Sequence, residues 1–262
     1  MRHTALAVDF DGTIAHDGVV PPHVVDGLRR LRETGRKLLL VTGRELEELL
    51  AIFPDVAIFH RVVAENGALL YRPASGEREE LGDPAPEELV ELLLARGVPI
   101  SVGHSIVATV EPHETTVLEA IRELGLESQV IFNKGAVMVL PAGVNKASGL
   151  KAALKELALS PRNLVAAGDG ENDHALLESA EYSVATANAI ATLRAKADRV
   201  TRETHGDGVL EVIADLIESD LERSPPRAPR RTLCIGRDVH GAPVTVGTAG
   251  VSMVVAGRPP AG

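Results

Sequence analysis

The sequence of 262 residues is short of several residue types, and each shortage excludes a class of protein. It has one cysteine, Cys234, so an internal disulfide framework is excluded and a reducing compartment is expected. Aromatic residues make up 2% and the net charge is −10, which argues against binding of nucleic acid by the main body of the chain. Apolar runs stay below the ~20 residues of a membrane span, and the first residues form no signal peptide. We therefore expect a cytoplasmic protein with no membrane partner.

Two stretches, residues 1–76 and 142–222, alternate between strand and helix patterns. The expected strands are residues 4–10, 37–41, 56–59, 62–64, 68–71, 163–167, 182–185 and 198–201, and the expected helices are residues 22–34, 45–52, 145–157, 173–179, 188–196 and 208–222. Such alternation predicts an α/β domain whose parallel sheet is covered by helices on both faces.

A different pattern separates these two stretches. Residues 72–86 are rich in proline, glycine and acidic residues, which is typical of a linker. The order helix, strand, strand then occurs twice, at residues 87–96, 98–102, 106–111, 114–124, 129–132 and 136–140. Two hairpins that each follow a helix indicate a small antiparallel sheet with helices on one face. We therefore expect an inserted α+β domain at residues 77–141.

The most informative segment is residues 8–14, Val-Asp-Phe-Asp-Gly-Thr-Ile, which follows an apolar run. Asp9 and Asp11 would end a buried strand, where two carboxylates must be solvated, paired or bound to a metal. Gly12 would let the backbone approach a ligand closely. Asp9 as nucleophile and Asp11 as proton donor would suit phosphoryl transfer. The alternative is a plain turn, because Asp-Gly is a common turn dipeptide.

Three further positions follow at expected strand or helix ends. Thr42 closes an apolar strand, Lys146 begins a helix, and Asp169 and Asp173 lie in the loop Gly-Asp-Gly-Glu-Asn-Asp. Each alone has an ordinary explanation as a cap, a solvated charge or a turn. At the carboxyl edge of one sheet they would form a phosphoryl-transfer site, with carboxylates for Mg²⁺ and a lysine for the phosphoryl oxygens.

These four motifs, in this order, resemble those of the haloacid dehalogenase (HAD) superfamily, specifically Cof-like phosphatases with a type-IIB cap. The family's DxDGT motif corresponds to residues 9–13, its strand-terminal threonine to Thr42, its lysine to Lys146 and its GDxxND motif to residues 168–173. The insert lies where the family places its cap. The resemblance covers about residues 4–220 and implies a Rossmann-like core.

The resemblance also implies roles for individual residues. Mg²⁺ would be held by Asp9, the main-chain carbonyl of Asp11 and Asp169. Asp173 would act through a water molecule or by contacting the residues that bind the metal. Asp9 would carry an aspartyl-phosphate, and an acid at position 11 is typical of the family's phosphatases. The expected phosphate-binding residues are Gly12, Thr42, Gly43, Lys146 and Asn172. The candidates for substrate contact are Arg44 and Asn66 near the site and His104, Glu111, His113, Glu114 and Arg122 in the insert.

The function that follows is a Mg²⁺-dependent phosphomonoester hydrolase acting on a small phosphorylated metabolite. The insert looks closer in size to that of archaeal phosphoglycolate phosphatases and is short for the Cof-type sugar phosphatases. Both substrate classes stay open. A phosphomutase or phosphotransferase is the alternative within enzymes. A signalling receiver uses similar residues, but it lacks an inserted cap.

Residues 223–262 differ from the rest, with six arginines against one acid, Asp238. Residues 224–229 are typical of a proline-rich linker, and short strands are expected at residues 233–235, 244–246 and 251–255. Residues 257–262 have the spacing of the start of a P-loop and resemble the lead-in to an ATPase domain. One hypothesis is a fused ATPase, for which the phosphatase would be an end-processing or regulatory module. The alternative is a Gly/Pro-rich tail.

Overall fold

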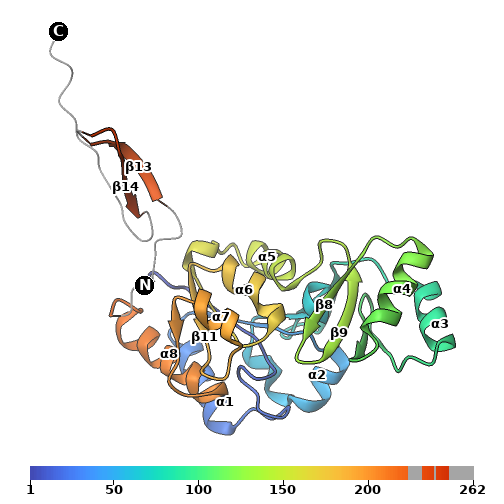
Figure 1. Ribbon diagram of the computed structural model, residues 1–262. Coiled ribbons are helices and arrows are strands. Elements are labelled where there is room, and N and C mark those ends of the chain that lie inside the picture. The colour runs from blue at the N-terminus through green and yellow to red at the C-terminus, as the bar shows by residue number, and fades with distance from the viewer. Residues whose placement is uncertain (224–231, 239, 248–262) are drawn as a thin grey trace.

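The computed structural model describes residues 1–223, 232–238 and 240–247, and its largest element is an eight-stranded sheet (Figure 1). The strand order is β12-β11-β10-β1-β2-β3-β4-β5. From β12 to β3 all neighbours are parallel, whereas β4 and β5 pair antiparallel. The strands are β1 (Ala5–Val8), β2 (Lys37–Val41), β3 (Arg61–Ala64), β4 (Leu69–Arg72), β5 (Glu77–Glu80), β10 (Leu164–Gly168), β11 (Tyr182–Ala185) and β12 (Arg199–Val200). The expected α/β fold with a parallel sheet is confirmed.

Helices cover both faces of this large sheet. They are α1 (Pro22–Glu33), α2 (Leu46–Ile52), α5 (Lys146–Glu156), α6 (His174–Ser179), α7 (Ala191–Lys196) and α8 (His205–Ser219). Leu6 and Val8 of β1 pack in one core cluster with residues of α1 and α8, while Ala5 and Ala7 pack in another with residues of α5, α6 and α7. Both alternate sets are apolar because both faces are covered, which explains the continuous apolar strand.

A second, four-stranded antiparallel sheet has the order β6-β7-β9-β8. It contains β6 (Ser101–Val102), β7 (Val107–Val110), β8 (Ser128–Asn133) and β9 (Ala136–Pro141), and it is accompanied by α3 (Glu87–Ala95) and α4 (Glu114–Leu124). Both helices lie on the side of this small sheet that faces away from the large sheet (Figure 1). Val107 and Val139 pack with these helices, whereas Ile106 and Met138 belong to a cluster on the opposite face. The expected repeat of helix, strand, strand is confirmed.

Two segments differ from the sequence prediction. Residues 56–59, expected as a strand, fall mainly in the 3₁₀ helix η1 (Pro54–Ile58), because Pro54 favours a turn at its start. Residues 77–80, expected to belong to the linker and the insert, form β5 and pair with β4. All four residues of β5 are exposed, so an edge strand held by backbone hydrogen bonds left no apolar pattern in the sequence.

In the tail, β13 (Thr232–Arg237) and β14 (Pro243–Gly247) form an antiparallel hairpin at the two positions expected as strands. The expected strand at residues 251–255 and the P-loop-like residues 257–262 lie outside the described residues. No helix within the described part of the chain is long and apolar enough to cross a membrane.

Candidate active site

The carboxyl ends of β1, β2 and β10 lie side by side, because β1 pairs in parallel with both of the others. Asp9 directly follows β1, Thr42 follows β2 and Asp169 follows β10. The sheet register therefore brings together three side chains that are far apart in the sequence, as expected for the edge of an open α/β sheet.

A buried lysine joins two of the carboxylates. Lys146 Nζ lies 2.5 Å from Asp9 Oδ1 and 2.7 Å from Asp173 Oδ1, and its side chain is 1% exposed. The residue is the first of α5, whose N-terminus is fixed by a capping box between Asn145 and Ser148. A cation at a helix N-terminus opposes the helix dipole, so its place there depends on the carboxylates that it contacts.

The other oxygens of the acid cluster are held by the loop after β10 and by Thr13. Asp173 Oδ2 accepts hydrogen bonds from the backbone N–H groups of Asp169 and Gly170, both at 2.9 Å. The Thr13 hydroxyl lies 3.1 Å from Asp169 Oδ1 and 3.3 Å from Asp9 Oδ2. The backbone of the loop after β10 thus fixes the orientation of the Asp173 carboxylate. Thr13 bridges Asp9 and Asp169, the two acids that follow neighbouring strands.

The cluster carries more negative charge than the protein compensates locally. Ligand oxygens of Asp9, Asp169 and Asp173 all lie within 4.8 Å of one another, and all three residues are buried. Burial, then the charge of Asp173, raises the pKa of Asp9 to about 8 despite the contact with Lys146. Burial alone would lower the pKa of Lys146, but Asp173 and Asp9 outweigh it and the pKa is raised. Buried hard oxygen donors with excess negative charge fit a divalent cation such as Mg²⁺.

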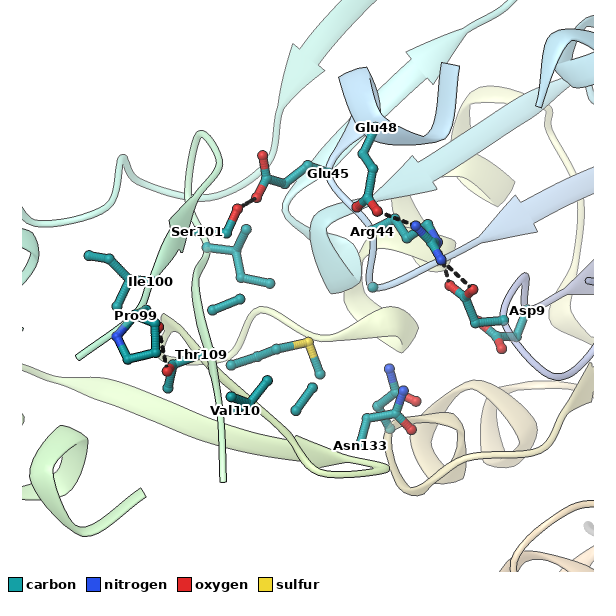
Figure 2. A pocket seen from close by; sticks show the side chains of 17 residues that line it. Asp9, Arg44, Glu45, Glu48, Pro99, Ile100, Ser101, Thr109, Val110 and Asn133 are labelled. Atoms are coloured by element: carbon teal, nitrogen blue, oxygen red, sulfur yellow. Dashed lines mark hydrogen bonds and ion pairs between the residues drawn. The ribbon is translucent and has the colours of Figure 1, made fainter. Parts of the chain in front are cut away.

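Asp11 points away from this cluster and contacts Arg44. The two Asp11 carboxylate oxygens accept from Arg44 Nε and Nη2, each at 2.7 Å. Arg44 also contacts Glu48 (Figure 2). The hydrogen bonds with Asp11 raise the pKa of Arg44, although its partial burial acts in the opposite direction. Thr42 is fully buried, and its Oγ1 accepts from the Arg44 N–H at 3.1 Å. The arrangement links the loop after β2 to the second acid of the DxDGT segment.

Asn66 and Asn172 form a buried pair beside Gly43. Asn172 Nδ2 donates to Asn66 Oδ1 at 3.0 Å, and a Cβ on Gly43 would lie 3.5 Å from Asn172 Nδ2. Asn66 Nδ2 and Asn172 Oδ1 have no hydrogen-bond partner among the described residues. An unpaired buried donor is costly, so a ligand oxygen would stabilise this position.

A cavity of about 630 Å³ separates the two sheets and opens onto this site (Figure 2). From the large-sheet side it is lined by Asp9, Asp11, Gly43, Arg44, Glu45, Glu48 and Asn172. From the other side it is lined by Pro99, Ile100, Ser101, Ile106, Ala108, Thr109, Val110, Asn133, Ala136 and Met138, which we call the insert wall. The insert candidates His104, Glu111, His113, Glu114 and Arg122 do not line this cavity. The expectation for those five rested on their polarity, whereas the insert wall is largely apolar.

Three residues at or near the site were not predicted from the sequence. Lys134, in the β8–β9 turn, contacts Asp169 Oδ2 and lies with its Nζ 3.4 Å from the Asp11 carbonyl oxygen. Asn188 Nδ2 lies 2.8 Å from the Gly12 carbonyl oxygen. Glu65 is buried and accepts from the backbone N–H groups of residues 104–106, at 2.9–3.3 Å. Lys134 lies between two expected strands and Glu65 beside Asn66, but only the folded chain reveals their contacts.

Comparison with known proteins agrees with this geometry. A family model described as haloacid dehalogenase-like hydrolase matches residues 6–102 and 106–213. The phosphoglycolate phosphatase of Methanothermobacter thermautotrophicus is 34% identical over 218 residues, covering 80% of this chain and 96% of that protein. The phosphoglycolate phosphatase of Natronomonas pharaonis is 34% identical over 220 residues, covering 79% and 95%.

Solved structures show the same fold. A haloacid dehalogenase-like hydrolase from Bacteroides thetaiotaomicron superimposes with a TM-score of 0.71 at 19% identity, covering 82% of this chain and 99% of that chain. A HAD subclass IIB sugar phosphatase gives a TM-score of 0.67 at 19% identity, covering 81% and 98%. These comparisons do not support the expected ATPase resemblance of residues 257–262, which lie beyond the last residue that the family model matches. The chain belongs to the haloacid dehalogenase-like hydrolases.

Proposed function

We propose that this protein is a Mg²⁺-dependent phosphomonoesterase that acts on a small phosphorylated metabolite, with phosphoglycolate the first substrate to test. The observation that carries the proposal is the buried group of Asp9, Asp169 and Asp173 around Lys146 at the carboxyl edge of the sheet. Relatives that are 34% identical over nearly their whole length are phosphoglycolate phosphatases, which favours this substrate over sugar phosphates.

The proposed reaction begins with attack by a carboxylate oxygen of Asp9 on phosphorus. The new bond joins Asp9 to the phosphoryl group, and the bond from phosphorus to the leaving oxygen breaks. Asp11 gives its proton to that leaving oxygen. A water molecule then attacks phosphorus and loses its proton to Asp11, which releases inorganic phosphate and restores both acids. Burial of Asp9, at 5% exposed, keeps bulk water away from the nucleophile.

Several groups of the chain are suited to hold the phosphoryl oxygens. Lys146 supplies a buried positive charge beside Asp9, and Thr42 and the backbone N–H group of Gly43 would orient the oxygens. The Gly12 N–H, expected to bind phosphate, donates instead to the Ala15 carbonyl oxygen at 2.9 Å. Mg²⁺, held by Asp9, Asp169 and the Asp11 carbonyl oxygen, would neutralise charge on the phosphoryl group so that one anion can approach another. Asp173 would act from behind, because its carboxylate is already bonded to Lys146 and the loop backbone.

The pairing of Asp11 with Arg44 adds one requirement to this reaction. Both Asp11 oxygens accept from Arg44, so Asp11 can carry and deliver a proton only when this pair opens. Arg44 lines the cavity and could turn to the substrate in the same movement. The pair would thereby couple substrate entry to the release of the proton donor.

The proposal is tested by measuring phosphate release from phosphoglycolate, glucose 6-phosphate and p-nitrophenyl phosphate, with Mg²⁺ and with EDTA. We expect Mg²⁺-dependent release from all three that is fastest from phosphoglycolate. Absence of release from every ester in the presence of Mg²⁺ would refute the proposal. Transfer of the phosphoryl group within a sugar phosphate, without free phosphate, would favour the phosphomutase instead.

A further inference from the structure

The turn between β8 and β9 is the part of the small sheet that reaches the catalytic edge. The backbone N–H of Lys134 donates to Glu171 Oε2 at 3.2 Å, and its φ of +48° lies in the left-handed region. Asn133, next to it, packs so closely on the loop after β10 that a Cβ on Gly170 would lie 2.2 Å from Asn133 Oδ1. These contacts of the turn with the loop after β10 place the Lys134 ammonium between Asp169 Oδ2 and the Asp11 carbonyl oxygen.

Lys134 is also the single charged residue of the small sheet and its β8–β9 turn. The polar hydroxyls of the insert wall are already used, since Thr109 Oγ1 donates to the Pro99 carbonyl at 2.6 Å and Ser101 donates to Glu45. The remaining polar side chain of the insert wall is Asn133, whose Oδ1 has no hydrogen-bond partner among the described residues. A sugar would therefore find few partners for its hydroxyls on this side, whereas a short anionic leaving group would find one cation.

We infer that Lys134 is a specificity-determining residue that binds the carboxylate of a short phosphorylated hydroxy acid; this inference rests on the proposed function. In phosphoglycolate the carboxylate lies one methylene from the ester oxygen, so it would lie close to the phosphoryl site. Asp169 Oδ2 and the Asp11 carbonyl oxygen are also expected to ligate Mg²⁺, and two cations repel at one oxygen. The flexible chain of Lys134 would then turn its ammonium to the substrate anion.

Arg44 is the one cation among the described residues that line the cavity, but its guanidinium already contacts Asp11 and Glu48. Its charge is therefore balanced within the large-sheet side. Lys134 reaches the site from the turn between Asn133 and Ala136, which both line the cavity. Lys134 has 41% of its side chain exposed, which leaves access for a ligand. We therefore assign the substrate carboxylate to Lys134, the cation that the insert contributes.

The test compares phosphoglycolate with 2-hydroxyethyl phosphate, which has a neutral hydroxymethyl group in place of the carboxylate. We expect wild type to prefer phosphoglycolate in kcat/KM. In Lys134→Met this preference should fall by about 10- to 100-fold, the range for one hydrogen bond to a charged group, mainly through KM. Lys151→Met, which removes the same charge from an exposed position on α5, should keep the preference.

A readout independent of turnover separates substrate binding from effects on the metal site. Mg²⁺ binding measured by calorimetry should be no weaker in Lys134→Met than in wild type. Equal losses for both esters, or Mg²⁺ binding weakened more than about 10-fold, would overturn the inference. A wild type that hydrolyses p-nitrophenyl phosphate without preferring phosphoglycolate would also overturn it and leave the phosphatase proposal standing. Failure to hydrolyse any ester would refute the proposed function itself.

Discussion

The two walls of the cavity differ in polarity: one is charged and the other is largely apolar. The large-sheet side, which we call the charged wall, presents Asp9, Asp11, Arg44, Glu45 and Glu48 to the cavity. Asp169, Asp173 and Lys146 are buried beside Asp9. The insert wall is mostly apolar, and its one nearby charge, Lys134, comes from a turn. The difference indicates a division of labour in which one wall performs phosphoryl transfer and the other selects the leaving group. Each experiment below perturbs one wall and asks whether the other still works.

The largest effect is expected from Asp9→Asn, which removes the nucleophile from the charged wall. Hydrolysis of p-nitrophenyl phosphate with Mg²⁺ should fall by about 10⁴-fold or more, as for loss of a covalent nucleophile. Circular dichroism should show an intact fold, because the amide has nearly the same shape. Turnover close to wild type would show that the charged wall works by another mechanism.

Asp11→Asn should cost about 10²- to 10⁴-fold in kcat, the range for loss of a general acid. The loss should be larger for phosphoglycolate than for p-nitrophenyl phosphate, because p-nitrophenolate leaves readily without a proton. Kinetics with both esters measure this difference. Equal losses would assign Asp11 to a role other than protonation, such as holding Arg44.

Glu65→Gln tests whether the two walls depend on one another. Glu65 joins the turn after β3 to residues 104–106 through three backbone N–H groups, and an amide would leave one of these donors poorly paired. We expect the free energy of unfolding in urea to fall by about 1–3 kcal/mol, together with a raised KM. Glu91→Gln, on an exposed position of α3, should stay within about 0.5 kcal/mol of wild type. Unchanged stability and KM in Glu65→Gln would mean that this contact does not position the insert.

The smallest effect concerns pH. The pKa of Asp9 is raised to about 8 in the folded protein, above the ~3.9 of an unfolded aspartate, so the folded state holds a proton that the unfolded state has lost. Without Mg²⁺, the free energy of unfolding should therefore fall as pH rises from about 6.5 to 8, by on the order of 1–2 kcal/mol. Thermal unfolding should show this fall in wild type and not in Asp9→Asn, and excess Mg²⁺ should reduce it. The same fall in the free energy of unfolding with pH in both proteins would mean that a group other than Asp9 titrates.

The charged wall could be predicted from the sequence because strand ends carry their own signal. Asp9, Thr42 and Asp169 each follow an apolar run, and neighbouring parallel strands end at one edge whatever their separation along the chain. The fold was predictable for the same reason, since buried strands and amphipathic helices have periods that show in the sequence. The edge strand β5 was missed, because exposed backbone pairing leaves no such period.

The insert wall was not predictable in the same way. Ile106, Ala108 and Met138 are ordinary strand residues, and only their position in the small sheet turns them toward the cavity. Lys134 carries no motif, and its role depends on how the β8–β9 turn is seated on the loop after β10. The polar insert residues expected at the substrate, from His104 to Arg122, lie outside the cavity lining, because the wall is built from apolar strand residues.

The central claim is that Asp9 accepts the phosphoryl group. The most direct measurement is mass spectrometry of the protein after acid quench during turnover of phosphoglycolate with Mg²⁺, with the phosphoryl group mapped by proteolysis. The account predicts one phosphoryl group on the peptide that contains Asp9, and none in Asp9→Asn. A phosphoryl group on another residue, with none on the peptide that contains Asp9, would contradict it.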